Sequence, residues 1–167
     1  HILNNASGAV REKVDILFEN SMPKEERAQL ATLIYYPKEK LEEISRSVKD
    51  MNEWYKITLN RLIEICRLVA SKYTRSKVRK ALPKEYAYII DELLNTNYEI
   101  FNKKEYYENI ISTIINIDCA EDFVVAICTV IKRLVVDHLH IVGDIFDRGA
   151  RPDLILDLLM SHHSVDL

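Results

Sequence analysis

The sequence has 167 residues, enough for one ordinary domain or for part of a larger one. Its 23 Lys and Arg against 26 Asp and Glu give a net charge of -3, which argues against a general nucleic-acid binder, since such proteins cluster positive charge against phosphates. Hydrophobic residues make up 48% of the chain, but no apolar run is long enough to span a bilayer and no signal peptide opens the chain, so we expect no membrane association.

The numbers of glycines and cysteines indicate the secondary-structure class and the cellular compartment of the protein. Only three glycines occur, against roughly twelve expected at a usage of about 7%, so tight turns are few and most of the chain is predicted to be helical. The three cysteines are odd in number and lack metal-site spacing, and two lie in apolar stretches. We interpret Cys66, Cys119 and Cys128 as buried free thiols in a reducing compartment, and so expect a cytoplasmic protein.

A succession of helices is predicted up to Arg133, from apolar positions spaced three and four apart and from start signals such as proline and capping residues. The predicted helices are one opened by Pro23, one opened by Pro37, one over Glu53–Tyr73, one over Lys84–Leu94, one capped by Asn102, and one over Phe123–Arg133 behind a capping box of Asp118 and Glu121.

A basic stretch at residues 72–80 interrupts this helical region, and it has two interpretations. The first is a solvated helix face and connector. The second is an anion site for a phosphorylated substrate or effector, since Arg and Lys pair with phosphate oxygens. The sequence leaves both open.

The last 31 residues differ in composition from the rest. Residues 137–167 contain six Asp and two Arg, a net charge of -4, whereas the first 136 residues have a net charge of +1. Residues 139–142 form a short β-rich run that stops at Gly143-Asp144. A loop, a helix opened by Pro152 and a second strand from His163 are predicted to follow. In such a unit the loop lies beyond the carboxyl end of the first strand, where α/β sheets bind ligands.

The loop Gly143–Gly149 carries side chains suited to phosphate chemistry. Asp144 offers a hard oxygen ligand beside a glycine, so that a metal can approach closely, and one carboxylate can bridge two cations. Arg148 could reach a metal-bound phosphate with its planar guanidinium, and Asp147 could orient a histidine from another part of the chain. The pattern therefore favours two-metal hydrolysis of a phosphate ester.

The sequence Gly143-Asp-Ile-Phe-Asp-Arg-Gly149 resembles the second motif of the calcineurin-like metallophosphatases. Within that superfamily the whole chain is similar to class 3 fructose-1,6-bisphosphatase, a bacterial enzyme of carbohydrate metabolism. Ala150 departs from the family, which usually has proline there. The similarity is carried by His1–Gly8, Tyr73–Pro83, Asp137–Gly149 and His163–Asp166.

The resemblance implies a specific reaction and specific roles. Asp144 would be the carboxylate shared by two metal ions, expected to be Mn²⁺, Arg148 would bind the scissile phosphate, and Asp147 would support the catalytic histidine. The reaction would be hydrolysis of the 1-phosphate of fructose 1,6-bisphosphate, a step of gluconeogenesis. Nucleotide and phosphoenolpyruvate effectors are implied as further partners.

The resemblance also implies a mostly α architecture in three parts. Residues 1–20 would end the first βα unit of an α/β metallophosphatase core, residues 21–133 would form a helical insertion, and residues 134–167 would return to the core. The family's motifs Asp-x-His-Gly and Gly-Asn-His-Asp are absent from this sequence, so we expect an internal fragment, inactive by itself, with exposed apolar core surface that favours homo-oligomers.

Two other interpretations stay open. A protein or dinucleoside-polyphosphate phosphatase of the same superfamily would need the Asp-Arg-Gly loop but not the long helical region. A non-catalytic helical interaction module would make the Gly-Asp loop incidental. His138, His140, His162 and His163 are expected to have structural or solvent-facing roles.

Overall fold

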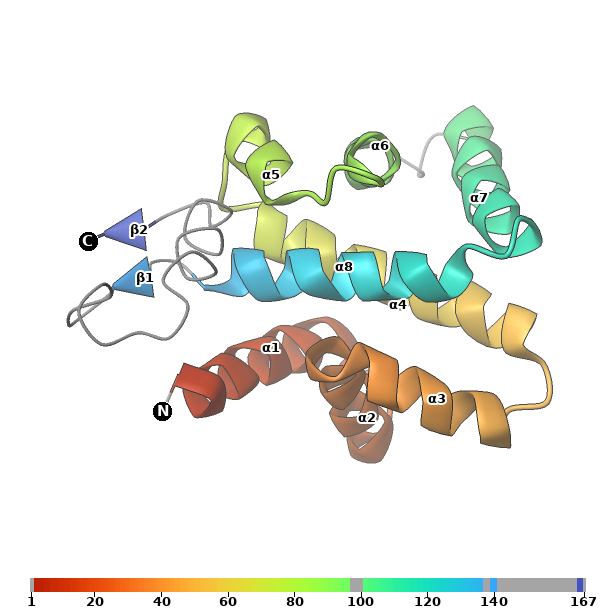
Figure 1. Cartoon of the computed structure of the whole chain (residues 1–167), viewed down its shortest axis with the longest axis horizontal. Coiled ribbons are helices and arrows are strands. Elements are labelled where there is room, and N and C mark those ends of the chain that lie inside the picture. Colours follow the sequence, from red (N-terminus) through yellow and green to blue (C-terminus); the bar gives the residue numbers. More distant parts are fainter. Residues whose placement is uncertain (1, 97–100, 137–138, 141–164, 167) are drawn as a thin grey trace, which may run out of the picture.

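A computed structural model describes residues 2–96, 101–136, 139–140 and 165–166, with side chains for residues 8–96 and 103–136. Within these ranges the chain is mostly helical, as predicted (Figure 1). The helices are α1 Ile2–Phe18, α2 Lys24–Tyr35, α3 Pro37–Ser47, α4 Met51–Ala70, α5 Arg75–Ala81, α6 Ala87–Asn95, α7 Phe101–Asn116 and α8 Ala120–Val135, and the strands are β1 Leu139–His140 and β2 Val165–Asp166. No helix in this part of the chain is both long and apolar enough to cross a bilayer.

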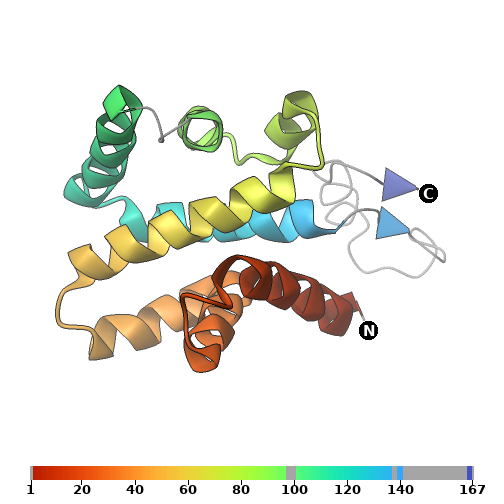
Figure 2. The same ribbon diagram turned by 180° about the vertical axis from the view of Figure 1, so that it is seen from behind.

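The middle of the molecule is the pair α4 and α8, which have the most extensive contact between any two described elements. Helices α1–α3 lie on one side of this pair and α5–α7 on the other (Figures 1 and 2). Both helices contribute fully buried apolar side chains to the core, including Leu62 and Cys66 on α4 and Phe123, Ile127 and Ile131 on α8. Burial of this apolar surface supplies the main free energy that holds the helices together.

Local signals in the sequence explain where several helices begin. Pro37 occupies the first turn of α3, where its missing N–H costs nothing. The Asp50 carboxylate accepts a hydrogen bond from the Glu53 N–H at 3.0 Å and caps α4. Thr74 caps α5 in the same way, accepting from the Lys77 N–H at 3.4 Å. The predicted starts near Pro23 and Pro37 are thus confirmed.

Two predicted helix starts are wrong. Helix α6 begins at Ala87 rather than Lys84, because residues 84–86 form a turn closed by the Tyr86 N–H on the Pro83 carbonyl at 3.1 Å. Helix α7 already begins at Phe101, so Asn102 lies inside the helix and does not cap it.

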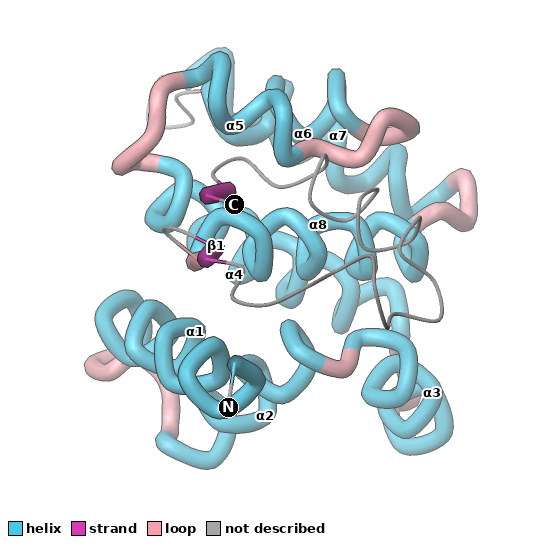
Figure 3. Tube along the Cα trace, turned by 60° about the vertical axis from the view of Figure 1, so that its left-hand side comes forward, coloured by secondary structure: helices cyan, strands magenta, loops and turns pink. Residues whose placement is uncertain are grey.

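The two strands lie at the end of the molecule where α8 ends (Figures 1 and 3). They pair in parallel, with Leu139 opposite Val165 and His140 opposite Asp166. Parallel strands need a crossover connection of a dozen or more residues, and residues 141–164 separate β1 from β2 in the sequence. The predicted strands are confirmed at Leu139–His140 and Val165–Asp166; the boundaries at residues 20 and 133, and the attachment to a metallophosphatase core, stay predictions.

The capping box predicted at Asp118 is also wrong, because Asp118 ends α7 instead of starting α8. Its φ is 61°, in the left-handed region, and its N–H bonds the Ile115 carbonyl while the Cys119 N–H bonds the Ile114 carbonyl, both at 3.1 Å. This is a Schellman motif with aspartate where glycine is usual. Cys119 begins α8 without a side-chain cap.

We predict that Asp118→Gly raises the free energy of unfolding by about 0.5 kcal/mol, because glycine adopts the left-handed conformation without steric cost. Asp118→Ala should lower it by a similar amount, since alanine keeps the steric cost and loses the local polar side chain. Urea unfolding followed by circular dichroism measures both. A decrease for the glycine variant would contradict the assignment of this turn.

Candidate active site

The motif residues Asp144, Asp147 and Arg148 lie outside the described residues, as do His138, His162 and His163. The structure does describe the two strands that bound the motif segment. β1 ends at His140, and the segment follows its carboxyl end, as the strand–loop–helix–strand prediction requires. The described residues elsewhere in the chain contain no group of three or more His, Cys, Asp or Glu side chains that could hold a metal ion.

Three side chains hold the end of α8, from which the chain passes into β1. The Tyr73 hydroxyl donates to the carbonyls of Leu134, at 3.2 Å, and Val136, at 3.5 Å. Arg133 donates to the Ala81 carbonyl at the end of α5, at 2.9 Å. Lys132 donates in turn to the carbonyl of Tyr35 at the end of α2, at 3.3 Å. The exit of α8 is therefore hydrogen-bonded to both outer layers.

Nothing in the amino-acid sequence indicates these hydrogen bonds. Tyr73 is predicted to end the helix Glu53–Tyr73, but it lies in the turn that follows α4, which ends at Ala70. Its partners are backbone carbonyls more than sixty positions away, which every residue possesses, so no pattern of side chains marks them.

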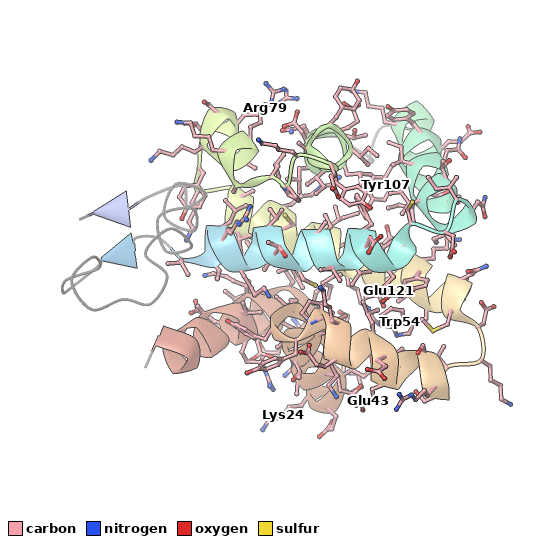
Figure 4. All side chains as sticks on the ribbon, in the orientation of Figure 1. Lys24, Glu43, Trp54, Arg79, Tyr107 and Glu121 are labelled. Carbon is pink, nitrogen blue, oxygen red and sulfur yellow. The ribbon has the colours of Figure 1, made fainter. Side chains whose placement is uncertain are left out.

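The two arginines of the basic stretch, Arg75 and Arg79, lie at the surface and pair with a buried carboxylate. Asp91 on α6 is only 7% exposed and accepts hydrogen bonds from Arg75, at 2.7 and 3.2 Å, and from Arg79, at 3.0 and 3.3 Å. Asn95 donates to the same carboxylate at 3.1 Å. The hydrogen bond from Arg75, together with that from Arg79, lowers the pKa of Asp91 against the opposing effect of burial. Arg79 lies in the α5–α7 layer (Figure 4).

The Asp91 carboxylate bears on whether residues 72–80 are a helix face and connector or an anion site. Arg75 and Arg79 neutralise an internal charge, which favours the structural interpretation for these two residues. A cavity of about 320 Å³ lies beside Arg75, between α4, α5 and α6. Its lining consists of Arg67, Ala70, Ser71, Tyr73, Arg75, Val78, Leu94 and Asn95.

The cysteines are free thiols in different environments. Cys66 and Cys128 are fully buried between α4 and α8, and burial raises the pKa of each thiol to about 12. Cys119, at the start of α8, is only partly buried. The prediction of buried thiols is confirmed for Cys66 and Cys128 and holds in part for Cys119.

Comparison with known proteins identifies the family. The family model described as "Firmicute fructose-1,6-bisphosphatase" matches residues 1–167, and the chain belongs to this family. It is 59% identical to "Fructose-1,6-bisphosphatase class 3" of Clostridium novyi (strain NT), over 100% of this chain and 25% of the relative. It is 57% identical to "Fructose-1,6-bisphosphatase class 3 2" of Clostridium beijerinckii, over 100% of this chain and 26% of the relative. No solved structure matches the chain.

The chain thus spans about a quarter of the length of the curated relatives that it matches. The resemblance drawn from the motif loop and its neighbouring segments is confirmed at the level of the family.

We predict that Asp91→Asn lowers the free energy of unfolding at pH 7 by about 1.5–3 kcal/mol, because two arginines lose a charged partner. The folded pKa of Asp91 lies below its unfolded value, so its contribution is full above the unfolded pKa of about 3.9 and is lost as pH falls through the folded pKa. The difference between wild type and variant should therefore be constant from pH 7 to about 5 and shrink below about pH 4.

Unfolding in urea at a series of pH values measures this difference. The exposed neighbour Glu85, changed to Gln, serves as the control and should alter stability little. A difference that grows as the pH falls would contradict the Asp91 pairing.

We also predict that one thiol reacts rapidly with a disulfide reagent at pH 8, and that it is Cys119. Cys66 and Cys128 should react at least about 100-fold more slowly, because their thiolates form only when the fold opens. Cys119→Ser should remove the rapid phase, and all three thiols should react alike in guanidinium. Two rapid thiols in the native wild type would show that the α4–α8 contact is not closed.

Proposed function

We propose that this chain is a segment of a metal-dependent phosphomonoesterase that hydrolyses fructose 1,6-bisphosphate to fructose 6-phosphate and phosphate in gluconeogenesis. The supporting observation is that relatives named fructose-1,6-bisphosphatase class 3 align with every residue of the chain at 54–59% identity. The parallel pairing of β1 with β2 agrees with a motif loop at the carboxyl end of a core strand.

The motif loop supplies three side chains to the proposed site. The Asp144 carboxylate is a hard oxygen donor suited to Mn²⁺, and we assign it as the ligand shared by two ions. The ions, when bound, supply an activated water and neutralise the phosphate. Arg148 binds the phosphate oxygens with its guanidinium fork, and Asp147 accepts a hydrogen bond from the catalytic histidine and orients it.

The proposed site also needs metal ligands from outside this chain. One carboxylate cannot hold two metal ions, so the remaining ligands come from other parts of the enzyme and the 167 residues are inactive by themselves.

Residues 21–133 form an insertion on an α/β calcineurin-like core. The enzyme is cytoplasmic and forms homo-oligomers. Its partners are the sugar bisphosphate and the nucleotide and phosphoenolpyruvate effectors.

The test is phosphate release by the full-length enzyme with added Mn²⁺, on fructose 1,6-bisphosphate, a phosphopeptide and a dinucleoside polyphosphate. We expect selective turnover of the sugar bisphosphate. Asp144→Asn should lower kcat at least about 100-fold, since even changes behind metal ligands cost 10- to 100-fold.

The matched control is Asp157→Asn, an aspartate of the same acidic segment outside the motif, which should keep wild-type turnover. Turnover of one of the other substrates would keep the two-metal chemistry and reject the substrate. Absence of turnover on all three would leave the helical interaction module as the better interpretation.

A further inference from the structure

The last residues of α8 need hydrogen-bond donors from outside the helix. The final carbonyls of any helix have no partner within it, and an end that passes directly into a strand cannot continue the ladder. α8 ends at Val135 and β1 begins at Leu139. Tyr73 supplies the missing donor, because its hydroxyl lies 3.2 Å from the Leu134 carbonyl and 3.5 Å from that of Val136.

Tyr73 is itself held in place by the fold. It lies in the turn between α4 and α5, where its N–H donates to the Ala70 carbonyl at 3.0 Å. α5 is attached to α6 through the two arginines on Asp91 and to α8 through Arg133 on the Ala81 carbonyl. Hydrogen bonds therefore run in both directions between the α5 region and the end of α8, one from Tyr73 and one from Arg133.

We propose that Tyr73 is a positioning residue of the enzyme: by fixing the carbonyls at the exit of α8, it sets where β1 starts, and the Gly143–Gly149 loop follows β1 in the sequence. The inference rests on the proposed function, since that loop carries the assigned metal ligand and phosphate-binding arginine. Small displacements of such groups are costly, because a misplacement of about 1 Å can cost a factor of about 100 in rate.

The hydroxyl can be removed without disturbing the ring. The Tyr73 ring is partly buried against the apolar core, and the Lys72 ammonium lies 5.2 Å from its centroid. Phenylalanine keeps the ring in both contacts and removes the hydroxyl, whose single proton the Leu134 and Val136 carbonyls share. Tyr73→Phe therefore isolates the contribution of the hydroxyl to the position of β1.

The experiment uses the full-length enzyme with two controls. Tyr88→Phe makes the same chemical change at a side chain that is 83% exposed. Asp15→Asn weakens the 2.6 Å ion pair with Arg27, which joins α1 to α2 away from the α8 exit. The measurements are kcat and KM for fructose 1,6-bisphosphate, and amide hydrogen exchange of residues 134–142.

For Tyr73→Phe we expect kcat to fall about 3- to 30-fold with KM within about twofold, and exchange of residues 134–142 to rise about fivefold, as loss of one hydrogen bond predicts. Both controls should keep wild-type kcat and wild-type exchange there. This combination supports the inference, because a general loss of stability would affect Asp15→Asn as well.

Three results would overturn the positioning role. They are unchanged exchange in Tyr73→Phe, faster exchange with an unchanged kcat in an active enzyme, and an equal fall of kcat in Asp15→Asn. If the wild type does not hydrolyse the sugar bisphosphate, the proposed function fails. The link between Tyr73 and β1 is then supported or overturned by the exchange data alone.

Discussion

The packing of α8 against α4 is the contact on which the other elements depend. Both helices bury a continuous apolar face, and the outer layers α1–α3 and α5–α7 attach to them from opposite sides. A helix buried on several sides can be fixed in position only if its ends are also satisfied, because unpaired carbonyls away from water are costly. The Tyr73 hydroxyl meets this requirement at the end of α8 nearest β1, and Arg133 and Lys132 of α8 in turn donate to the carbonyls of Ala81 at the end of α5 and Tyr35 at the end of α2.

Local chemistry explains which helix boundaries were predictable. Proline fixes its own φ and lacks a donor, so Pro37 marks the start of α3 wherever the rest of the chain lies. Asp118 is ambiguous, because aspartate serves both as an N-terminal cap and as a residue that tolerates the left-handed conformation. The pairing of the Cys119 N–H with the Ile114 carbonyl decides between these roles, and it depends on where α7 ends. The scarcity of glycine predicted that the chain is mostly helical. The turn at the end of α7 was missed because aspartate occupies the left-handed position where glycine is usual.

In the candidate site, too, the local features were predictable from the sequence and the long-range contacts were not. Asp144, Asp147 and Arg148 could be proposed from the sequence because their chemistry and spacing are local to one loop. The elements that hold this loop were not predictable, since the Tyr73 hydroxyl bonds backbone carbonyls that leave no mark in the sequence. Asp91 is an intermediate case. The basic run around Arg75 and Arg79 was evident, but its buried partner lies on the next helix, and an aspartate in an amphipathic helix is ordinarily solvent-facing.

The central position of α8 also has a consequence for synthesis of the protein. α8 is the last of the described helices to be made, yet α1, α2, α3 and α4 all contact it. At roughly 5–20 residues per second, α4 waits for several seconds on the ribosome before its partner emerges. During that interval the apolar faces of the earlier helices are exposed, and chaperones can bind them. β1 follows directly after α8, so the helical layers can close just as the motif loop is being made.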